Sequence, residues 1–171
     1  MKALGDYLHA RGLKFGIYSD AGTNTCACYA GSNGHEYQDA FTYASPAVDY
    51  LKYDWCYTNN LNPVGAYTTM RSALKRAGRP ILFSICEWGS NRPWEWAQNV
   101  GHSWRTTGDI FPSWDSVKGI IAENLYMSAY SSKGHYNDMD MLEVGVNKWG
   151  NELTTEEAKT HFGMWCIMNS P

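Results

Sequence analysis

The stretch Tyr50-Leu51-Lys52-Tyr53-Asp54-Trp55-Cys56 carries the clearest signal for the fold of this chain. It opens as an apolar run that is typical of a buried strand, takes up a lysine, and closes on an aspartate. Lys52 and Asp54 have the same strand parity, so both side chains should point to one side of a sheet. A buried charge is costly unless it has a partner. The stretch therefore predicts a strand whose carboxyl end carries a paired or functional acid.

The same arrangement returns along the chain. Strands are expected at 15–19, 47–53, 81–86, 103–104 and 135–141, and helices at 2–11, 36–44, 64–77, 93–98, 113–127 and 154–162. This alternation predicts parallel strands joined by crossover helices. Acids fall at or just past the strand ends, at Asp20, Asp54, Glu87, Asp109, Asp138 and Asp140.

The spread of these acids decides between two architectures. An open doubly wound sheet concentrates its ligand residues at one switch point, whereas a (β/α)8 TIM barrel gathers them from many strand ends. The acids therefore favour the barrel. Since only about five strands can be counted, we expect residues 1–171 to form an incomplete barrel, about strands 3 to 7, without an internal domain boundary.

The composition is that of a globular domain. With 171 residues, of which 44% are hydrophobic, the chain can bury one sizeable core. The formal net charge is −3 and no basic stripe occurs, so nucleic acid is not an expected partner. No apolar run approaches the roughly 20 residues of a membrane span. Among the 8 Trp and 12 Tyr, most should pack in the core, and the best candidates for sugar-stacking platforms are Trp55, Trp88 and Trp104.

The chain has five cysteines, Cys26, Cys28, Cys56, Cys86 and Cys166. The Cys26-Ala27-Cys28 spacing is too tight for a zinc site, and the histidines do not cluster near it, so no metal is expected. Cys26 and Cys56 each follow a candidate strand, which makes a disulfide between them plausible. Such a bond would stabilise the fold by about 3–4 kcal/mol. It would also imply an oxidising location, either secreted or periplasmic.

Two carboxylates on different strand ends are what the cleavage of a glycosidic bond requires. Asp54 is the candidate nucleophile, because Lys52 would hold it ionised. Asp109, which closes the string Trp104–Asp109, is the candidate acid/base, because apolar neighbours would raise its pKa. The structural alternatives are a salt bridge for Asp54 and a helix N-terminal acid for Asp109.

The other acids suit the binding of hydroxyl groups. Asp20 and the Asp138/Asp140 pair can accept bidentate hydrogen bonds, although an Asx-type turn or a calcium motif would use the same residues. Glu87 and Trp88 combine a carboxylate with a ring, which suits one sugar hydroxyl beside an apolar sugar face. No Gly-x-Ser-x-Gly elbow and no phosphate loop occurs, so a serine hydrolase and a nucleotide enzyme are not expected.

Taken in order, six strings resemble the α-galactosidases of glycoside hydrolase family 27. They cover nearly the whole chain and are Phe15–Gly22, Thr25–Cys26, Asp49–Cys56, Cys86–Gly89, Trp104–Ile110 and Asn137–Leu142. The resemblance implies a (β/α)8 barrel followed by a β-sandwich, and removal of terminal α-galactose from oligo- or polysaccharides with retention of configuration. It implies no cofactor.

The resemblance also assigns roles to single residues. It implies Asp54 as nucleophile, Asp109 as acid/base and a disulfide between Cys26 and Cys56. Galactose would be bound by Tyr18, Lys52, Glu87, Arg105 and Asp140. Glu87 with Trp88 is similar to the galactose version of the site rather than the N-acetylgalactosamine version, whose relatives carry smaller residues there.

The chain departs from the family pattern in places. Asp138-Met139-Asp140 stands where Asp-Pro-Asp is common, and Cys28, Cys86 and Cys166 have no expected partners. The first two strands, the last strand and the sandwich have no counterpart, so we expect this chain alone to fold poorly and to be inactive. The alternatives are a β-L-arabinopyranosidase, an enzyme for isomaltose units, an α-N-acetylgalactosaminidase or a non-catalytic carbohydrate-binding remnant. The remnant would be expected to have lost Asp54 or Asp109, and both are present.

Overall fold

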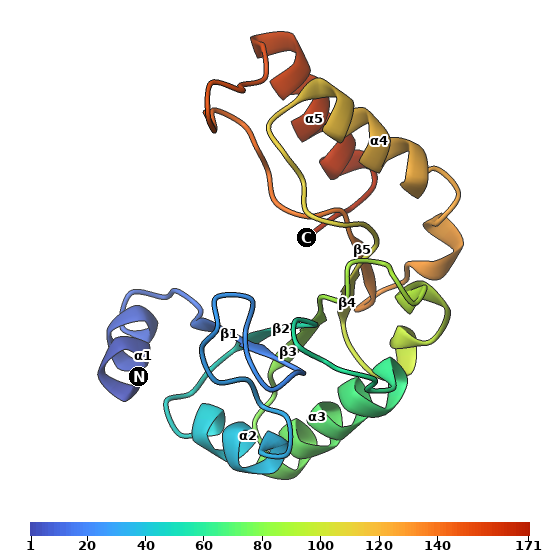
Figure 1. The fold of residues 1–171 in the computed structure, drawn as a ribbon. Helices are drawn as coiled ribbons and strands as arrows, with labels where there is room; N and C mark the ends of the chain where they lie inside the picture. The colour runs from blue at the N-terminus through green and yellow to red at the C-terminus, as the bar shows by residue number, and fades with distance from the viewer.

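A computed structural model describes residues 1–171 and contains one parallel sheet in the order β1-β2-β3-β4-β5 (Figure 1). The strands are β1 Gly16–Asp20, β2 Tyr50–Asp54, β3 Leu82–Ile85, β4 Ser103–Arg105 and β5 Tyr136–Asp138. Each strand pairs with the next one along the chain, so the strand order never reverses. This progression is typical of a barrel and not of a doubly wound sheet, in which the order switches direction. The sheet has two free edges, β1 and β5.

The helices agree with the expected ranges to within a few residues, except in one place. They are α1 Lys2–His9, α2 Glu36–Ala44, α3 Pro63–Ala77, α4 Trp114–Asn124 and α5 Thr155–Ile167, with 3₁₀ turns at Pro93–Glu95, Ala97–Asn99 and Ser128–Tyr130. The helix expected at 93–98 is thus replaced by two 3₁₀ turns. In Figure 1, α2 and α3 run below β1–β3, while α4 and α5 lie together beyond β5. None of the helices is long and apolar enough to cross a membrane.

Local signals explain where the longer helices begin and end. The Asn62 side chain caps α3 by accepting from the Gly65 N–H at 2.8 Å. The same helix ends at Gly78, whose φ of 77° suits glycine. Thr154 and Glu157 form the capping box expected at the start of α5.

The two faces of the sheet differ in character. Leu51, Phe83 and Trp104 point to the outer face, where they pack with Tyr67 and Met70 of α3 in a core cluster of 17 buried residues. Burying each large apolar side chain of this kind stabilises the fold by about 1.5–3 kcal/mol. On the inner face, register aligns one row across all five strands, Tyr18, Lys52, Ser84, Ser103 and Tyr136. The row is polar, and Tyr18 is 45% exposed.

A second, smaller core lies around α4 and α5. Val117, Ile120 and Trp165 are buried there together with Met139. Met139 is 1% exposed. Its thioether chain packs between the end of β5 and the two helices and so contributes to the core.

Asp49, just before β2, ties four segments together. Its Oδ2 accepts hydrogen bonds from the Phe15 N–H at 2.8 Å and from His9 at 2.7 Å, and its Oδ1 accepts from Arg79 at 2.6 Å. Burial alone would raise the pKa of Asp49, but these hydrogen bonds together lower it to about 2. The folded state therefore favours the ionised carboxylate.

Asp49→Asn in the full-length protein is expected to lower the free energy of unfolding at pH 7 by about 1–2 kcal/mol. A lowered acid pKa stabilises the fold above the unfolded pKa of about 3.9, and this contribution is lost as the pH falls through the folded value. Urea unfolding of both proteins from pH 7 downward measures it, and the difference should shrink between about pH 4 and 2. A difference that stays constant over that range would mean that ionisation of Asp49 does not stabilise the fold.

Candidate active site

Asp54 ends β2 on the inner face, with its side chain held from two sides. Its Oδ2 accepts from the Tyr18 hydroxyl at 2.8 Å and its Oδ1 from the Trp55 N–H at 3.0 Å. Burial and the hydrogen bond to Asp54 raise the pKa of Tyr18, so the phenol stays protonated and donates. Lys52 lies on the same face, one row away, and forms no ion pair with Asp54. The structural salt bridge considered from the sequence is therefore wrong.

Asp20 ends β1 beside Asp54, but its carboxylate hydrogen-bonds to backbone groups of the adjacent loops. It is fully buried, and its two oxygens accept from the Gly22 N–H at 2.7 Å and the Cys56 N–H at 3.0 Å. Burial raises the pKa of Asp20 to about 6 despite these hydrogen bonds. The contact with Gly22 is the Asx-type turn that the sequence left open. Asp20 organises the loop after β1, and its contacts do not support the sugar-binding role expected for it.

The disulfide between Cys26 and Cys56 is present, as expected. It joins the loop after β1 to the end of β2, with a Cα–Cα distance of 5.2 Å, and places the Cys26 sulfur 3.4 Å from Asp54 Oδ2. The donor atoms of Asp20, Cys26, Asp54 and Cys56 all lie within 4.8 Å of one another. Disulfide sulfurs are not thiolates, however, so this cluster is not a thiolate metal centre. The free cysteines are Cys28 and Cys166, both exposed, and Cys86, which is buried.

Arg105, at the end of β4, is a buried cation that holds two acids. It is 1% exposed, with Nη1 3.0 Å from Asp140 Oδ1 and Nη2 3.2 Å from Asp109 Oδ1. Nη2 also donates to the carbonyl oxygens of Gly108 at 2.7 Å and Thr107 at 3.2 Å. These contacts place Arg105 between Asp109 and Asp140, and its expected role in binding sugar stays a prediction.

Asp140 closes the arrangement from β5. Its Oδ2 accepts from the Ile110 N–H at 2.8 Å, and its own N–H donates to Asp138 Oδ1 at 2.8 Å. Its φ of 76° is unusual for a non-glycine residue. Asp140 is 8% exposed. Its contacts with Arg105 and with the Ile110 N–H link the loop after β5 to the end of β4 and the loop that follows it.

Asp109 follows β4 and differs from the other acids in its exposure. Its side chain is 81% exposed and is tethered only by Arg105. The apolar enclosure expected around it is not formed. It is also not a helix N-terminal acid, because α4 begins at Trp114 with Ser113 as its cap. Asp109 therefore presents a carboxylate to the open side of the site.

Glu87, just past β3, is fully buried. Its Oε2 accepts from the Asn91 N–H at 2.7 Å and from the Asn91 side-chain amide at 2.6 Å, while Oε1 is buried without a partner. Burial raises the pKa of the Glu87 carboxyl. The chain then turns through Trp88 and Gly89, both with positive φ, close against the carbonyl of Thr106. Oε1 has no exposed surface, so the expected role of Glu87 in binding sugar stays a prediction.

Two of the expected sugar platforms belong to the core instead. Trp104 points to the outer face, has no exposed surface, and donates its indole N–H to Asn137 Oδ1 at 2.7 Å. Trp55 is partly buried and stacks on Tyr67 with 5.4 Å between ring centroids. Trp88, partly exposed on the turn after β3, remains a candidate platform.

Sequence reasoning missed Asn91 and the carbonyl groups of Thr107 and Gly108. Asn91 fixes Glu87 from a turn four residues later, and the two carbonyls hold the Arg105 guanidinium. Backbone carbonyls leave no mark in the amino-acid sequence, because every residue has one. Only the path of the loop shows which of them face a cation.

Comparisons with known proteins agree with this arrangement. The family model described as alpha galactosidase A matches residues 1–171. Alpha-galactosidase A of Cellvibrio japonicus is 58% identical over 182 residues, which cover 100% of this chain and 44% of that protein. The crystal structure of alpha-galactosidase I from Mortierella vinacea has a TM-score of 0.94 at 37% identity, covering 99% of this chain and 48% of that one.

A third relative was solved with a sugar. The alpha-galactosidase from Saccharomyces cerevisiae with raffinose has a TM-score of 0.92 at 35% identity, over 99% of this chain and 43% of that one. The chain thus spans less than half the length of these relatives. The five strands are consecutive strands of a (β/α)8 barrel, which confirms the fold class expected from the sequence.

Proposed function

The chain belongs to the alpha-galactosidase A family, and from that premise we propose that the protein is a retaining glycosidase that removes terminal α-D-galactose from oligosaccharides or polysaccharides. The single observation that carries this proposal is that Asp54 and Asp109 follow two strands of one sheet and differ in environment: two hydrogen-bond donors hold Asp54, whereas Asp109 is exposed beside Arg105. Glycosidic cleavage needs two carboxylates in different roles.

Asp54 is the proposed nucleophile. Two hydrogen-bond donors, the Tyr18 hydroxyl and the Trp55 N–H, stabilise its charged form and fix its orientation. Its Oδ attacks the anomeric carbon and forms a glycosyl ester, while the bond to the glycosidic oxygen breaks. The electron pair of that bond goes to the leaving alcohol.

Asp109 is the proposed acid/base. It gives its proton to the glycosidic oxygen in the first step, and in the second step it takes a proton from the water that cleaves the ester at the anomeric carbon. Two inversions at one carbon give net retention. The proton taken from this water returns Asp109 to its acid form for the next cycle, and Arg105 keeps it near the site throughout.

The remaining inner-rim groups are proposed to bind the galactose ring. Lys52 has no acidic partner and offers three N–H donors to ring hydroxyls. Trp88, which is partly exposed after β3, offers an apolar surface. The buried Asp140 and Arg105 act by holding this rim in place. The structure of a relative with raffinose supports an α-galactoside as the substrate class. The disulfide supports a secreted or periplasmic location.

The direct test is hydrolysis of an aryl α-galactoside by the full-length protein, followed by proton NMR of the anomeric signal. We expect α-galactose as the first product, before mutarotation. Early β-galactose would mean inversion and would overturn the double displacement. An aryl β-L-arabinopyranoside and an aryl α-N-acetylgalactosaminide are run alongside, and faster turnover of either would overturn the substrate assignment.

Asp109→Asn is expected to lower kcat/KM for a galactoside with a poor leaving group by about 10²–10⁴-fold, because proton donation is lost. The loss should be much smaller for a nitrophenyl galactoside, whose leaving group departs without a proton. Comparing the two substrates measures this, with Asp115→Asn, an exposed acid on α4, as the control. Equal losses on both substrates would assign Asp109 a role other than proton donation.

A further inference from the structure

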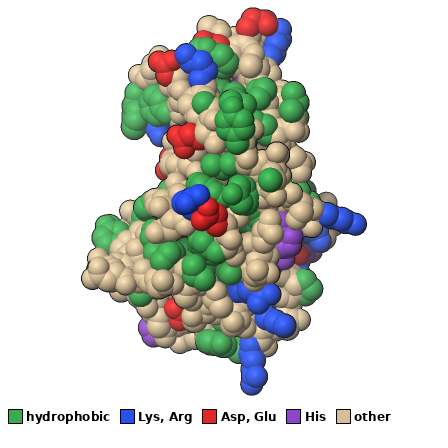
Figure 2. Space-filling model, turned by 90° about the vertical axis from the view of Figure 1, so that its right-hand side faces the viewer, with side chains coloured by type: hydrophobic (Ala, Val, Ile, Leu, Met, Phe, Trp, Pro, Cys, Tyr) green, Lys and Arg blue, Asp and Glu red, His purple; other side chains and the backbone are tan.

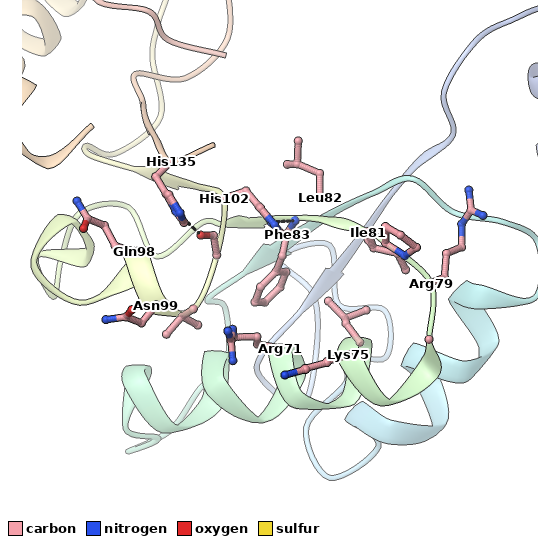
Figure 3. A pocket seen from close by; sticks show the side chains of 15 residues that line it. Arg71, Lys75, Arg79, Ile81, Leu82, Phe83, Gln98, Asn99, His102 and His135 are labelled. Atoms are coloured by element: carbon pink, nitrogen blue, oxygen red, sulfur yellow. Dashed lines mark hydrogen bonds between the residues drawn. The ribbon is translucent and has the colours of Figure 1, made fainter. Parts of the chain in front are cut away.

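A second cavity lies at the opposite end of the sheet from Asp54 and Asp109. It has a volume of about 580 Å³ and is formed by the carboxyl-terminal half of α3, the start of β3, and the segments that lead into β4 and β5 (Figure 3). These elements are central in the chain and adjacent in the sheet. We call this cavity the α3 pocket. Parallel strands run away from it toward the proposed catalytic rim, so the two sites do not share residues.

The α3 pocket is basic in a chain of net charge −3. Its 15 lining residues include Arg71, Lys75, Arg79, His102 and His135, and none of them is Asp or Glu. Arg79 is neutralised by Asp49. Arg71 and Lys75 form no ion pair with any acid of the chain. Figure 2 shows Lys and Arg side chains gathered on the lower half of one face of the molecule, near a histidine.

As a pair, Arg71 and Lys75 do not stabilise α3. They are four residues apart on α3, so they lie on one face, where like charges repel. Lys75 lies in the last turn, and there the helix macrodipole favours a cation. Arg71 lies beyond the reach of that effect. Both residues are exposed on α3 at the border of the pocket (Figure 3).

Of the two histidines, His102 adds a free hydrogen-bond donor to the pocket. His102 Nδ1 accepts from the Phe83 N–H at 2.9 Å, so its Nε2 carries the proton. His135 Nδ1 faces the Gly101 carbonyl at 3.2 Å, and since a carbonyl only accepts, this nitrogen is the donor. Burial, together with the nearby His135 and Arg71, lowers the pKa of His102. Arg71 and Lys75 thus supply positive charge in the pocket, and no acid among its lining residues compensates it.

We propose that the α3 pocket binds a small molecule that carries a phosphate group. A guanidinium fork, an ammonium and an imidazole N–H around one space are the donors that recognise phosphate. The volume lies within the range of about 300–1,000 Å³ typical of small-molecule sites, and it exceeds what a bare phosphate ion fills. Gln98 and Asn99 line the same cavity and offer amide groups for the rest of a phosphate ester.

The test is isothermal titration calorimetry on the full-length protein at constant ionic strength, with three probes: inorganic phosphate, glucose 6-phosphate and glucuronate. We expect saturable binding of the phosphate compounds and none of glucuronate. Arg71→Gln/Lys75→Gln should weaken phosphate binding at least about tenfold, because two charged contacts are lost. Arg76→Gln removes a neighbouring charge of α3 that does not line the pocket, and it should change the affinity less than about twofold.

The three probes distinguish a phosphate ester from phosphate itself and from a carboxylate. Tighter binding of glucose 6-phosphate than of inorganic phosphate would assign a phosphate ester, and equal binding would assign phosphate itself. No saturable binding, equal binding of glucuronate, or the same affinity in the double variant and in Arg76→Gln would overturn the proposal. Circular dichroism checks that the double variant is folded, and the single variants Arg71→Gln and Lys75→Gln replace it if it is not. The proposal does not depend on galactoside hydrolysis, which the double variant should retain at the wild-type rate.

Discussion

Asp54→Asn is expected to lower kcat/KM for an aryl α-galactoside by at least about 10⁴-fold, the scale on which removal of a nucleophile acts. The amide is not nucleophilic, so no glycosyl ester forms at this position. The fold should survive, because asparagine keeps the shape of the aspartate. Its oxygen can accept from the Trp55 N–H, and its NH₂ group can donate to the Tyr18 hydroxyl, which accepts as well as donates.

The measurement is initial-rate hydrolysis with the full-length protein, together with urea unfolding to show that stability is kept. Asp115→Asn, an exposed acid on α4, serves as the matched control and should leave the rate unchanged. A substrate with an activated aryl leaving group should not rescue Asp54→Asn, in contrast to the expectation for Asp109→Asn. If Asp54→Asn kept more than about one per cent of the rate, another group would have to be the nucleophile.

Arg105→Met is expected to lower the free energy of unfolding by about 3–5 kcal/mol, the typical cost of removing one partner from a buried charge pair. Methionine fills much of the volume of arginine, so the cost is mainly electrostatic. Without the guanidinium, the 8% exposed Asp140 is left as an uncompensated buried charge, and the carbonyls of Thr107 and Gly108 lose their donor. Asp109 also loses its tether, so activity should fall as well.

Urea unfolding of the full-length protein measures this effect. Lys118→Met is the control, since it removes a cation from an exposed pair on α4 and should change stability by no more than about 0.5 kcal/mol. Arg105→Lys should fall between the wild type and Arg105→Met, because one ammonium cannot reach both acids in the geometry of the guanidinium fork. A loss below about 1 kcal/mol for Arg105→Met would mean that Asp140 finds another partner or becomes protonated.

Local pattern was sufficient for the elements and for their parallel arrangement. The Asp49–Cys56 stretch has the short apolar run and terminal acid of a barrel strand, and β2 ends at Asp54, one residue past the expected end. The capping box at Thr154 and the disulfide between Cys26 and Cys56 were also found correctly. Such signals depend on residues close in sequence or on strand ends that must be neighbours in a parallel sheet. At 93–98 the prediction was wrong, because the backbone leaves the helical conformation at Trp96, whose φ is −127°, and this divides the segment into two short 3₁₀ turns.

The roles of individual acids needed the tertiary structure. From the sequence, Asp20, Asp54 and Asp109 are alike: each is a carboxylate at or after the end of a strand. Folding gives Asp20 two backbone donors, gives Asp54 the Tyr18 hydroxyl in place of the expected lysine, and leaves Asp109 exposed beside Arg105.

The sequence by itself determined the strands, the helices, the barrel class and the set of acids at the rim. The elements follow from apolar residues that repeat every two positions in strands and every 3.6 in helices, and the barrel class and the acids follow from the strand ends and the family strings. Only the tertiary structure decided which acid is buried, which is free, and where unpaired charge accumulates. The α3 pocket illustrates the reason. Arg71 and His135 are 64 positions apart, and no local pattern reports that both line one cavity. Burial and pairing set the energy of a charge, and both depend on neighbours that the fold brings from elsewhere in the chain.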